Sequence, residues 1–318
     1  MTAETESAMP QPRRLSFRRR AVATLLALFN PGVGHALMGR WLRGALWVGA
    51  IVVLSASLPF VGFVGVMVLL ALYVAAVVDV ARVAPPAVGV PSVWHALLMV
   101  VGIWLGSNVA LKGIRAVVTT PWRMPSGGMH PSLLQGDAIM TDATVAPPLR
   151  RRPLLRGEVL VFDPPHTSEG PFLQRIVALG GDTVRMEAGR LWLNGQPVSR
   201  RLTEDACIAT DPPGQAPGCA VYEELLGELN YLIQVGGEGA SLPTEEGRCP
   251  AHLELEGTSC KVPEGHLFVL GDNRDNSFDS RYFGAVPEAN VRGVGSYIFF
   301  SWTPERGARW DRLGQWLR

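Results

Sequence analysis

Apolar residues are concentrated in the first third of the chain, in runs that are too continuous for one face of a soluble helix. The clearest runs cover residues 42–58, 60–78 and 93–111. Each approaches the roughly 20 apolar residues that a helix needs to cross a bilayer. Only Pro59 separates the first two runs, which predicts a tight helical hairpin. The pattern therefore predicts three transmembrane helices within residues 41–112.

A shorter apolar run, residues 21–29, comes before these three and ends at Asn30-Pro31-Gly32. It is too short to span a bilayer, which favours an interfacial or re-entrant segment. A cleaved secretory signal would also fit the basic residues before it. However, no small-residue cleavage site follows, and Arg40 and Arg43 come soon after. Residues 1–40 are therefore expected to form a cytoplasmic tail and an interfacial segment.

The positions of the arginines predict how the helices are oriented. Five arginines lie within residues 13–20, Arg40 and Arg43 precede the first long run, and Arg82 lies between the second and third. Basic residues favour the cytoplasmic side of a membrane. Lys112 and Arg115 oppose this orientation but are outnumbered. We therefore expect a multi-pass protein of a bacterial-type cytoplasmic (inner) membrane, with everything after residue 112 extracytoplasmic.

Cysteine content and charge narrow the possible chemistry of the second half. The four cysteines are Cys207, Cys219, Cys249 and Cys260. Their confinement to this half fits disulfides in an oxidising compartment, and both local and crossed pairings are possible. Their spacing lacks the close pairs of a zinc site, so no metal is expected. The 29 basic and 28 acidic residues nearly cancel, which gives no reason to expect a nucleic-acid partner.

After residue 112 the pattern changes to short β-branched runs separated by glycine, proline and aspartate, which is typical of strands. Strands are expected at residues 138–140, 158–162, 172–178, 183–186, 190–193, 266–270 and 295–300. Residues 113–318 are therefore expected to form a mostly antiparallel β domain. Residues 200–263 carry all four cysteines and are expected to be an inserted subdomain. Trp302, Trp310 and Trp316 lie among arginines, which fits a membrane-interface helix or ordinary surface packing.

Four blocks of sequence carry the candidate chemistry. They are MPSGGMHPSLLQGD at residues 124–137, RGEVLVF at 156–162, QRIVALGGD at 174–182 and GDNRDNSFDSRYFG at 271–284. In this order, and behind apolar segments, they resemble the sequence blocks of the type I signal peptidases. Four ordered blocks are a far more specific signal than one short motif.

The resemblance implies a membrane-bound serine endopeptidase that removes signal peptides of exported preproteins and uses no cofactor. Its implied partners are signal peptides and the lipid bilayer. In that family a serine attacks the substrate and a buried, neutral lysine is its base. By position, Ser126 matches the oxyanion-hole serine and Ser277 matches the serine that orients the lysine. The implied structural residues near the site are Asp272, Arg274, Asp279 and Arg281.

Two positions depart from the family pattern. Gly128 stands where the family has its nucleophile, and Gln174 stands where it has its lysine. Glycine has no side chain that could attack, and a glutamine amide is not a base near neutral pH. The sequence therefore favours a non-catalytic family member that binds signal peptides or membrane proteins.

The alternative is an active peptidase with a non-standard nucleophile, such as Ser126 or Ser132, beside His130. Two residues along an extended chain displace a side chain by about 6–7 Å, which disfavours this substitution. His130 is expected to lie on the surface. The acidic residues of the fourth block are expected to form internal ion pairs with the arginines between them rather than a calcium loop.

Overall fold

The computed structural model describes residues 17–83, 93–165, 170–208, 218–236, 242 and 248–317. Residues 1–16 of the expected cytoplasmic tail lie outside them. The chain divides into two compact units, which are described separately. A helical unit comprises Met1–Ser57 and Val64–Ile114, and a β unit comprises Leu58–Phe63 and Arg115–Arg318.

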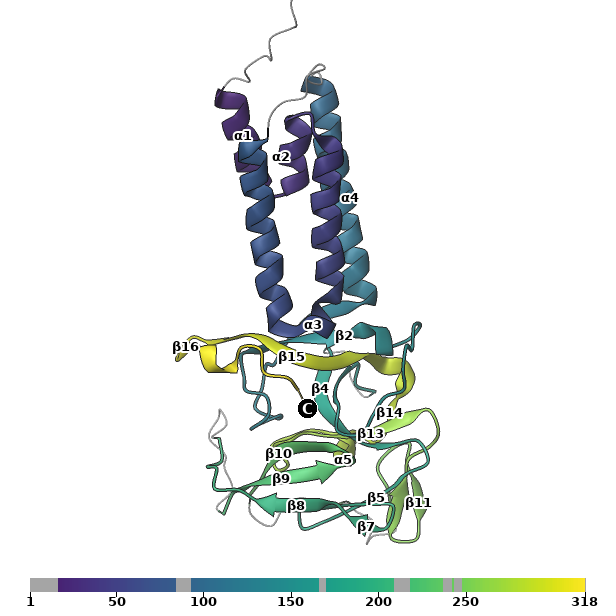
Figure 1. Cartoon of the computed structure of the whole chain (residues 1–318). Helices are drawn as coiled ribbons and strands as arrows, with labels where there is room; N and C mark the ends of the chain where they lie inside the picture. The colour runs from purple at the N-terminus through teal and green to yellow at the C-terminus, as the bar shows by residue number, and fades with distance from the viewer. Residues whose placement is uncertain are drawn as a thin grey trace, which may run out of the picture. The chain divides into compact units, whose positions relative to one another are not determined.

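The helical unit contains α1 (Phe17–Ala27), α2 (Pro31–Leu37), α3 (Trp41–Arg82) and α4 (Val93–Val117) (Figure 1). The helix α3 folds back on itself, as the single intervening Pro59 predicts. Its residues Arg43 and Asp79 form an ion pair of 2.6 Å. A straight helix would hold two residues of this separation about 54 Å apart. Figure 1 shows the two arms of α3 running antiparallel.

The second arm of α3, Val64–Arg82, is the one described helix that is long and apolar enough to cross a membrane. It has 19 residues and a mean hydropathy of 2.5. The first arm, Trp41–Ser55, is apolar but shorter. The membrane-spanning role of this arm and of α4 remains a prediction. The orientation of the helices in the membrane also remains a prediction.

The first two helices form a short hairpin that packs against the others. The turn between them contains Asn30, which is the N-cap of α2. Its side-chain oxygen accepts a hydrogen bond from Gly32 N over 3.0 Å. The Asn30 amide donates to Ser107 Oγ of α4 over 2.8 Å. The Tyr73 hydroxyl of α3 donates to Leu28 O over 2.7 Å. These contacts place the turn against both longer helices.

The β unit is built on an eight-stranded sheet in which every paired strand is antiparallel. Seven strands follow the order β1-β2-β15-β3-β4-β13-β14, and β16 pairs with β15. Their bounds are β1 (Thr119–Arg123), β2 (Asp137–Asp142), β3 (Val159–Phe162), β4 (Phe172–Leu179), β13 (His266–Leu270), β14 (Val286–Pro287), β15 (Val291–Thr303) and β16 (Gly307–Ala308). The predicted antiparallel β fold is confirmed.

Two smaller sheets complete this unit, together with short helical turns. One sheet, in the order β10-β9-β8, contains β8 (Ser199–Leu202), β9 (Ala220–Leu226) and β10 (Leu229–Val235). The other, in the order β11-β12-β5-β6-β7, contains β5 (Thr183–Glu187), β6 (Arg190–Leu193), β7 (Gln196–Pro197), β11 (Glu254–Glu256) and β12 (Ser259–Lys261). The short helices are η1 (Ala143–Val145), α5 (Ser280–Phe283), η3 (Glu288–Asn290) and η4 (Trp310–Arg312).

Both disulfides are local, joining Cys207 to Cys219 and Cys249 to Cys260. Residues 200–263 share a core with the rest of the unit, because Ile233 of β10 and Val184 of β5 are fully buried in one cluster. The inserted stretch is thus integrated into the β unit through this shared core.

The chain after Ser301 shows which of its two expected structures is present. The strand β15 continues to Thr303 and turns back into β16, and the only helical turn among the described residues that follow is η4. Of the two alternatives, the membrane-interface helix is therefore not formed by these residues. Hairpin pairing and surface packing account for this segment, and Trp316 packs against Tyr297 with ring centroids 5.5 Å apart.

Candidate active-site cleft

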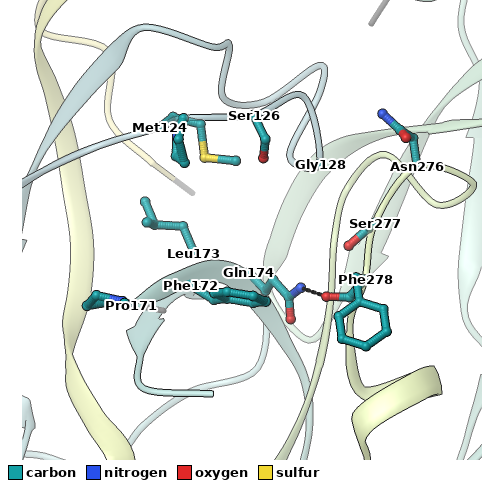
Figure 2. Close-up of a pocket in the computed structure, with 12 residues that line it drawn as sticks. Met124, Ser126, Gly128, Pro171, Phe172, Leu173, Gln174, Asn276, Ser277 and Phe278 are labelled. Carbon is teal, nitrogen blue, oxygen red and sulfur yellow. Dashed lines mark hydrogen bonds between the residues drawn. The ribbon is translucent and has the colours of Figure 1, made fainter. Parts of the chain in front are cut away.

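Three segments of the β unit surround a cavity of about 320 Å³ (Figure 2). The loop between β1 and β2 contributes Met124, Pro125, Ser126 and Gly128. The approach to β4 and its first residues contribute Gly170, Pro171, Phe172, Leu173 and Gln174. The loop after β13 contributes Asn276, Ser277 and Phe278. The sheet order places β4 beside β13, so the first, third and fourth sequence blocks meet at one cavity.

Gly128 faces the two serines that the resemblance singled out. A Cβ atom added to Gly128 would lie 3.8 Å from Ser126 Oγ and 3.9 Å from Ser277 Oγ. Its nearest neighbour would be the Asn276 carbonyl oxygen at 3.5 Å. All three are ordinary van der Waals distances, so the backbone here leaves room for a serine side chain. The space for a side chain is present at position 128, and glycine does not fill it.

Gln174 lies in β4, on the opposite side of the cavity from Ser126 (Figure 2). Its side chain is buried, and its amide nitrogen donates a hydrogen bond of 2.7 Å to the Phe278 carbonyl oxygen. This bond fixes which end of the amide faces the loop. Gln174 therefore ties β4 to the wall that Phe278 forms and offers no basic lone pair to the cavity.

The lining contains hydroxyl groups but no side chain that could activate them. Among the described residues around the cavity there is no lysine, histidine, aspartate or glutamate. A serine hydroxyl becomes a nucleophile only when a base takes its proton. Ser126 and Ser277 can therefore donate and accept hydrogen bonds to a bound chain, but none of the described lining residues could take a proton from them.

The other proposed nucleophile, Ser132, does not line the cavity. Its hydroxyl donates to Leu232 O over 3.1 Å and accepts from the Arg175 guanidinium at 3.3 Å. The expected surface position of His130 is wrong, because only 5% of this residue is exposed. Its neighbours Met129 and Leu133 are buried in a hydrophobic core, so the segment that contains His130 lies inside the β unit. Burial lowers the pKa of His130, outweighing the opposing effects of the Ile208 backbone and Asp137.

Ion pairs support the fourth block from behind the cavity. Asp279 pairs with Arg281 at 2.7 Å and also accepts from Gly271 N at 3.0 Å. Asp272 accepts two hydrogen bonds, of 2.8 and 2.7 Å, from Arg175. All of these charged side chains are buried. A buried charge needs such partners, and removing one leaves the other uncompensated.

A third buried ion pair was not foreseen from the sequence. Arg274 pairs with Glu224 at 2.5 Å, and Tyr231 donates to the same carboxylate at 2.6 Å. Burial and the negative charge of Glu224 raise the pKa of Tyr231 well above its ordinary value. Glu224 and Tyr231 belong to β9 and β10, so the inserted stretch supplies partners to the fourth block. A glutamate in a polar stretch normally indicates a solvated face, which is why this role was missed.

The chain after β15 also reaches the loop that carries Gly128. Asp137, at the start of β2, is fully buried and accepts hydrogen bonds from Arg309 (3.1 Å) and Arg312 (2.6 Å). Arg309 also donates to Gln135 O at 2.6 Å, and Arg312 to Ser132 O at 2.9 Å. We call Asp137, Arg309 and Arg312 the tail clamp. It holds the loop that precedes β2 in place.

Known proteins match the part of the chain that forms this cleft. The family model described as signal peptidase, peptidase S26, matches residues 94–302. Signal peptidase I of Pseudomonas aeruginosa is 32% identical over 211 residues, covering 59% of this chain and 67% of that protein. Signal peptidase I of Aquifex aeolicus is 32% identical over 212 residues, covering 61% and 80%.

A plant relative extends the match beyond bacteria. The chloroplast thylakoidal processing peptidase 1 of Arabidopsis thaliana is 26% identical over 201 residues, covering 60% of this chain and 44% of that protein. The family model covers well over half of the present chain and includes every residue that lines the cavity. The chain therefore belongs to the signal peptidase family, peptidase S26.

Proposed function

We propose that this protein is a membrane-anchored member of the signal peptidase I family that binds signal peptides of exported preproteins without cleaving them. The observation that carries the proposal is the pairing of Gly128 with Gln174 at one cavity. These are the two positions that would hold the nucleophile and its base. Loss of the nucleophile alone costs a serine protease about a millionfold in kcat.

The cavity keeps features that a binding site needs. Its volume of about 320 Å³ lies within the range of ligand pockets. Its lining is uncharged, so an apolar or small side chain enters without burying an unpaired charge. Hydroxyl and amide groups of Ser126, Ser277 and Asn276 lie at its wall and can bond to a peptide backbone (Figure 2). These features support recognition of an extended peptide in the absence of catalysis.

The proposed placement has three helices in a cytoplasmic-type membrane and residues 113–318 outside the cytoplasm. The apolar arm Val64–Arg82 supports a span. The pairs Cys207–Cys219 and Cys249–Cys260 support an oxidising compartment for the β unit. The arginines before residue 83 support a cytoplasmic N-terminal side.

A cleavage and crosslinking assay on the purified full chain in detergent tests this function. A preprotein with a photoreactive group in its signal peptide should crosslink to the protein and remain uncut. Gly128→Leu should abolish crosslinking by filling the cavity, whereas Gly128→Ala should keep it, because a Cβ there meets no atom closer than 3.5 Å.

The second candidate function is an active peptidase that uses Ser126, whose hydroxyl does line the cavity. Cleavage of the preprotein by the unaltered protein that disappears in Ser126→Ala would establish it and overturn the binding proposal. A lack of both cleavage and crosslinking would reject both candidates.

A further inference from the structure

The helical segment before residue 94 lies outside the family match and carries charges that take no part in the proposed binding of signal peptides. Within residues 17–83 the sequence has six arginines and a single acidic residue, Asp79. The arginines are Arg18, Arg19, Arg20, Arg40, Arg43 and Arg82, and we call them the arginine collar.

Hydrogen bonds show that the collar gathers at one end of the helical unit. Arg19, in the first turn of α1, donates to Leu37 O at the end of α2 over 2.9 and 3.1 Å. Arg40 and Arg43 follow at the start of α3. The Arg43–Asp79 pair brings the end of α3, with Arg82 one turn further on, to the same place. Three segments distant in sequence thus present positive charge together: the start of α1 and the two ends of α3.

Asp79 cannot neutralise this collar because its carboxylate is already engaged. Arg43 donates two hydrogen bonds to it, of 2.7 and 2.6 Å. Trp47 Nε1 donates a third of 2.9 Å, and His35 Nε2 lies 2.8 Å from the same carboxylate. Among the described residues the carboxylate of Asp79 is thus taken up by Arg43 and its neighbours, and the side chains of Arg18, Arg20 and Arg82 are exposed.

Apolar side chains begin where the collar ends. Trp41 is exposed between Arg40 and Arg43, and tryptophan favours the headgroup level of a bilayer. Further along the two arms of α3, exposed side chains are apolar, as at Leu46, Val53 and Val74. Positive charge above an exposed apolar surface matches a phosphate headgroup above its acyl chains.

We infer that the arginine collar binds the phosphate headgroups of anionic phospholipids in preference to zwitterionic ones. The inference rests on the membrane placement proposed above, but not on the cleft. Each arginine near an anionic surface strengthens attraction about fivefold, and the effect weakens as salt is added.

The test measures lipid bound to the purified full chain in detergent by native mass spectrometry, with phosphatidylglycerol or phosphatidylcholine added. The unaltered protein should prefer phosphatidylglycerol. Arg20→Gln with Arg82→Gln should lower that preference by about 25-fold. The matched control, Lys112→Gln with Arg115→Gln near the end of α4, removes the same charge and should leave the preference unchanged.

Equal binding of the two lipids by the unaltered protein, or an equal loss in the control variant, would overturn the inference. Inorganic phosphate that displaces phosphatidylglycerol at equal concentration would show a site for a free anion instead. Signal-peptide crosslinking measured on the same variants separates the two proposals. The variant Arg20→Gln with Arg82→Gln should still crosslink to the signal peptide. If no variant crosslinks, the peptide-binding proposal is rejected and the lipid-binding inference is unaffected.

Discussion

Gly128 and Gln174 differ in how each fills its position at the cleft. Gly128 leaves a space that a side chain could occupy at 3.5–3.9 Å from its neighbours. Gln174 fills its position and bonds to the Phe278 carbonyl oxygen at 2.7 Å. Glycine therefore leaves position 128 without a side chain, while Gln174 gives its position a structural contact.

Because the space is intact, Gly128→Ser combined with Gln174→Lys should create preprotein cleavage. A lysine at the buried position 174 would have a lowered pKa and could accept the serine proton. Each single variant should stay inactive, since either the nucleophile or the base is missing. Release of mature protein on a gel is the measurement, with Gly128→Ala plus Gln174→Lys as the control without a hydroxyl. An inactive but folded double variant would mean that the cleft geometry differs from that of an active enzyme.

His130 should make the protein sensitive to acid. Burial lowers its pKa in the folded state, whereas the unfolded chain has the ordinary value of about 6.5. The unfolded state therefore binds more protons below that pH, and the free energy of unfolding falls as the pH drops through it. Urea unfolding at about pH 7.5 and about pH 5.5 should show a smaller loss for His130→Gln than for the unaltered protein. Equal losses would assign the acid sensitivity to other groups.

At the scale of elements, the segment after β15 supports the loop before β2 through the tail clamp. Arg312→Gln removes a charged partner from Asp137, which is fully buried and keeps only Arg309 as a cationic partner among the described residues. Breaking a buried pair costs about 3–5 kcal/mol. Hydrogen exchange at residues 129–137 should accelerate. Trp310→Ala, in the same short helix at a residue 72% exposed, should leave exchange unchanged. Equal acceleration in both variants would indicate general loosening of the segment.

Elements formed by short apolar runs between turn residues were predictable from the sequence. The strand expected at residues 190–193 is β6, and the one expected at 266–270 is β13, with the same bounds. The sheet β8–β10 was missed, because its stretch is rich in glycine, proline and glutamate. Sequence blocks identified the residues at the cleft, since the resemblance preserves their order. Burial of His130 and the Glu224–Arg274 pair were not predictable, because both depend on segments far away in the chain.

At the scale of the whole molecule, the β unit has cores of its own. All residues of the three largest clusters, from Trp122 to Leu317, belong to the β unit. A unit with its own core can fold alone. Residues 115–318 produced without the helices should therefore give dispersed NMR amide signals and the two native disulfides by peptide mapping. An oxidised fragment that stays unfolded would show that the helical unit is needed for folding.

The local pairing of the cysteines has a consequence for biosynthesis. Each bridge joins residues only 12 or 11 positions apart. With the placement proposed above, the β unit emerges from its N-terminal end into an oxidising compartment, so Cys207 and Cys219 are both available before Cys249 emerges. The second pair then closes before β15 appears. The order of emergence thus selects the native pairing kinetically, and the long closing strand β15 joins a chain whose covalent connections are already complete.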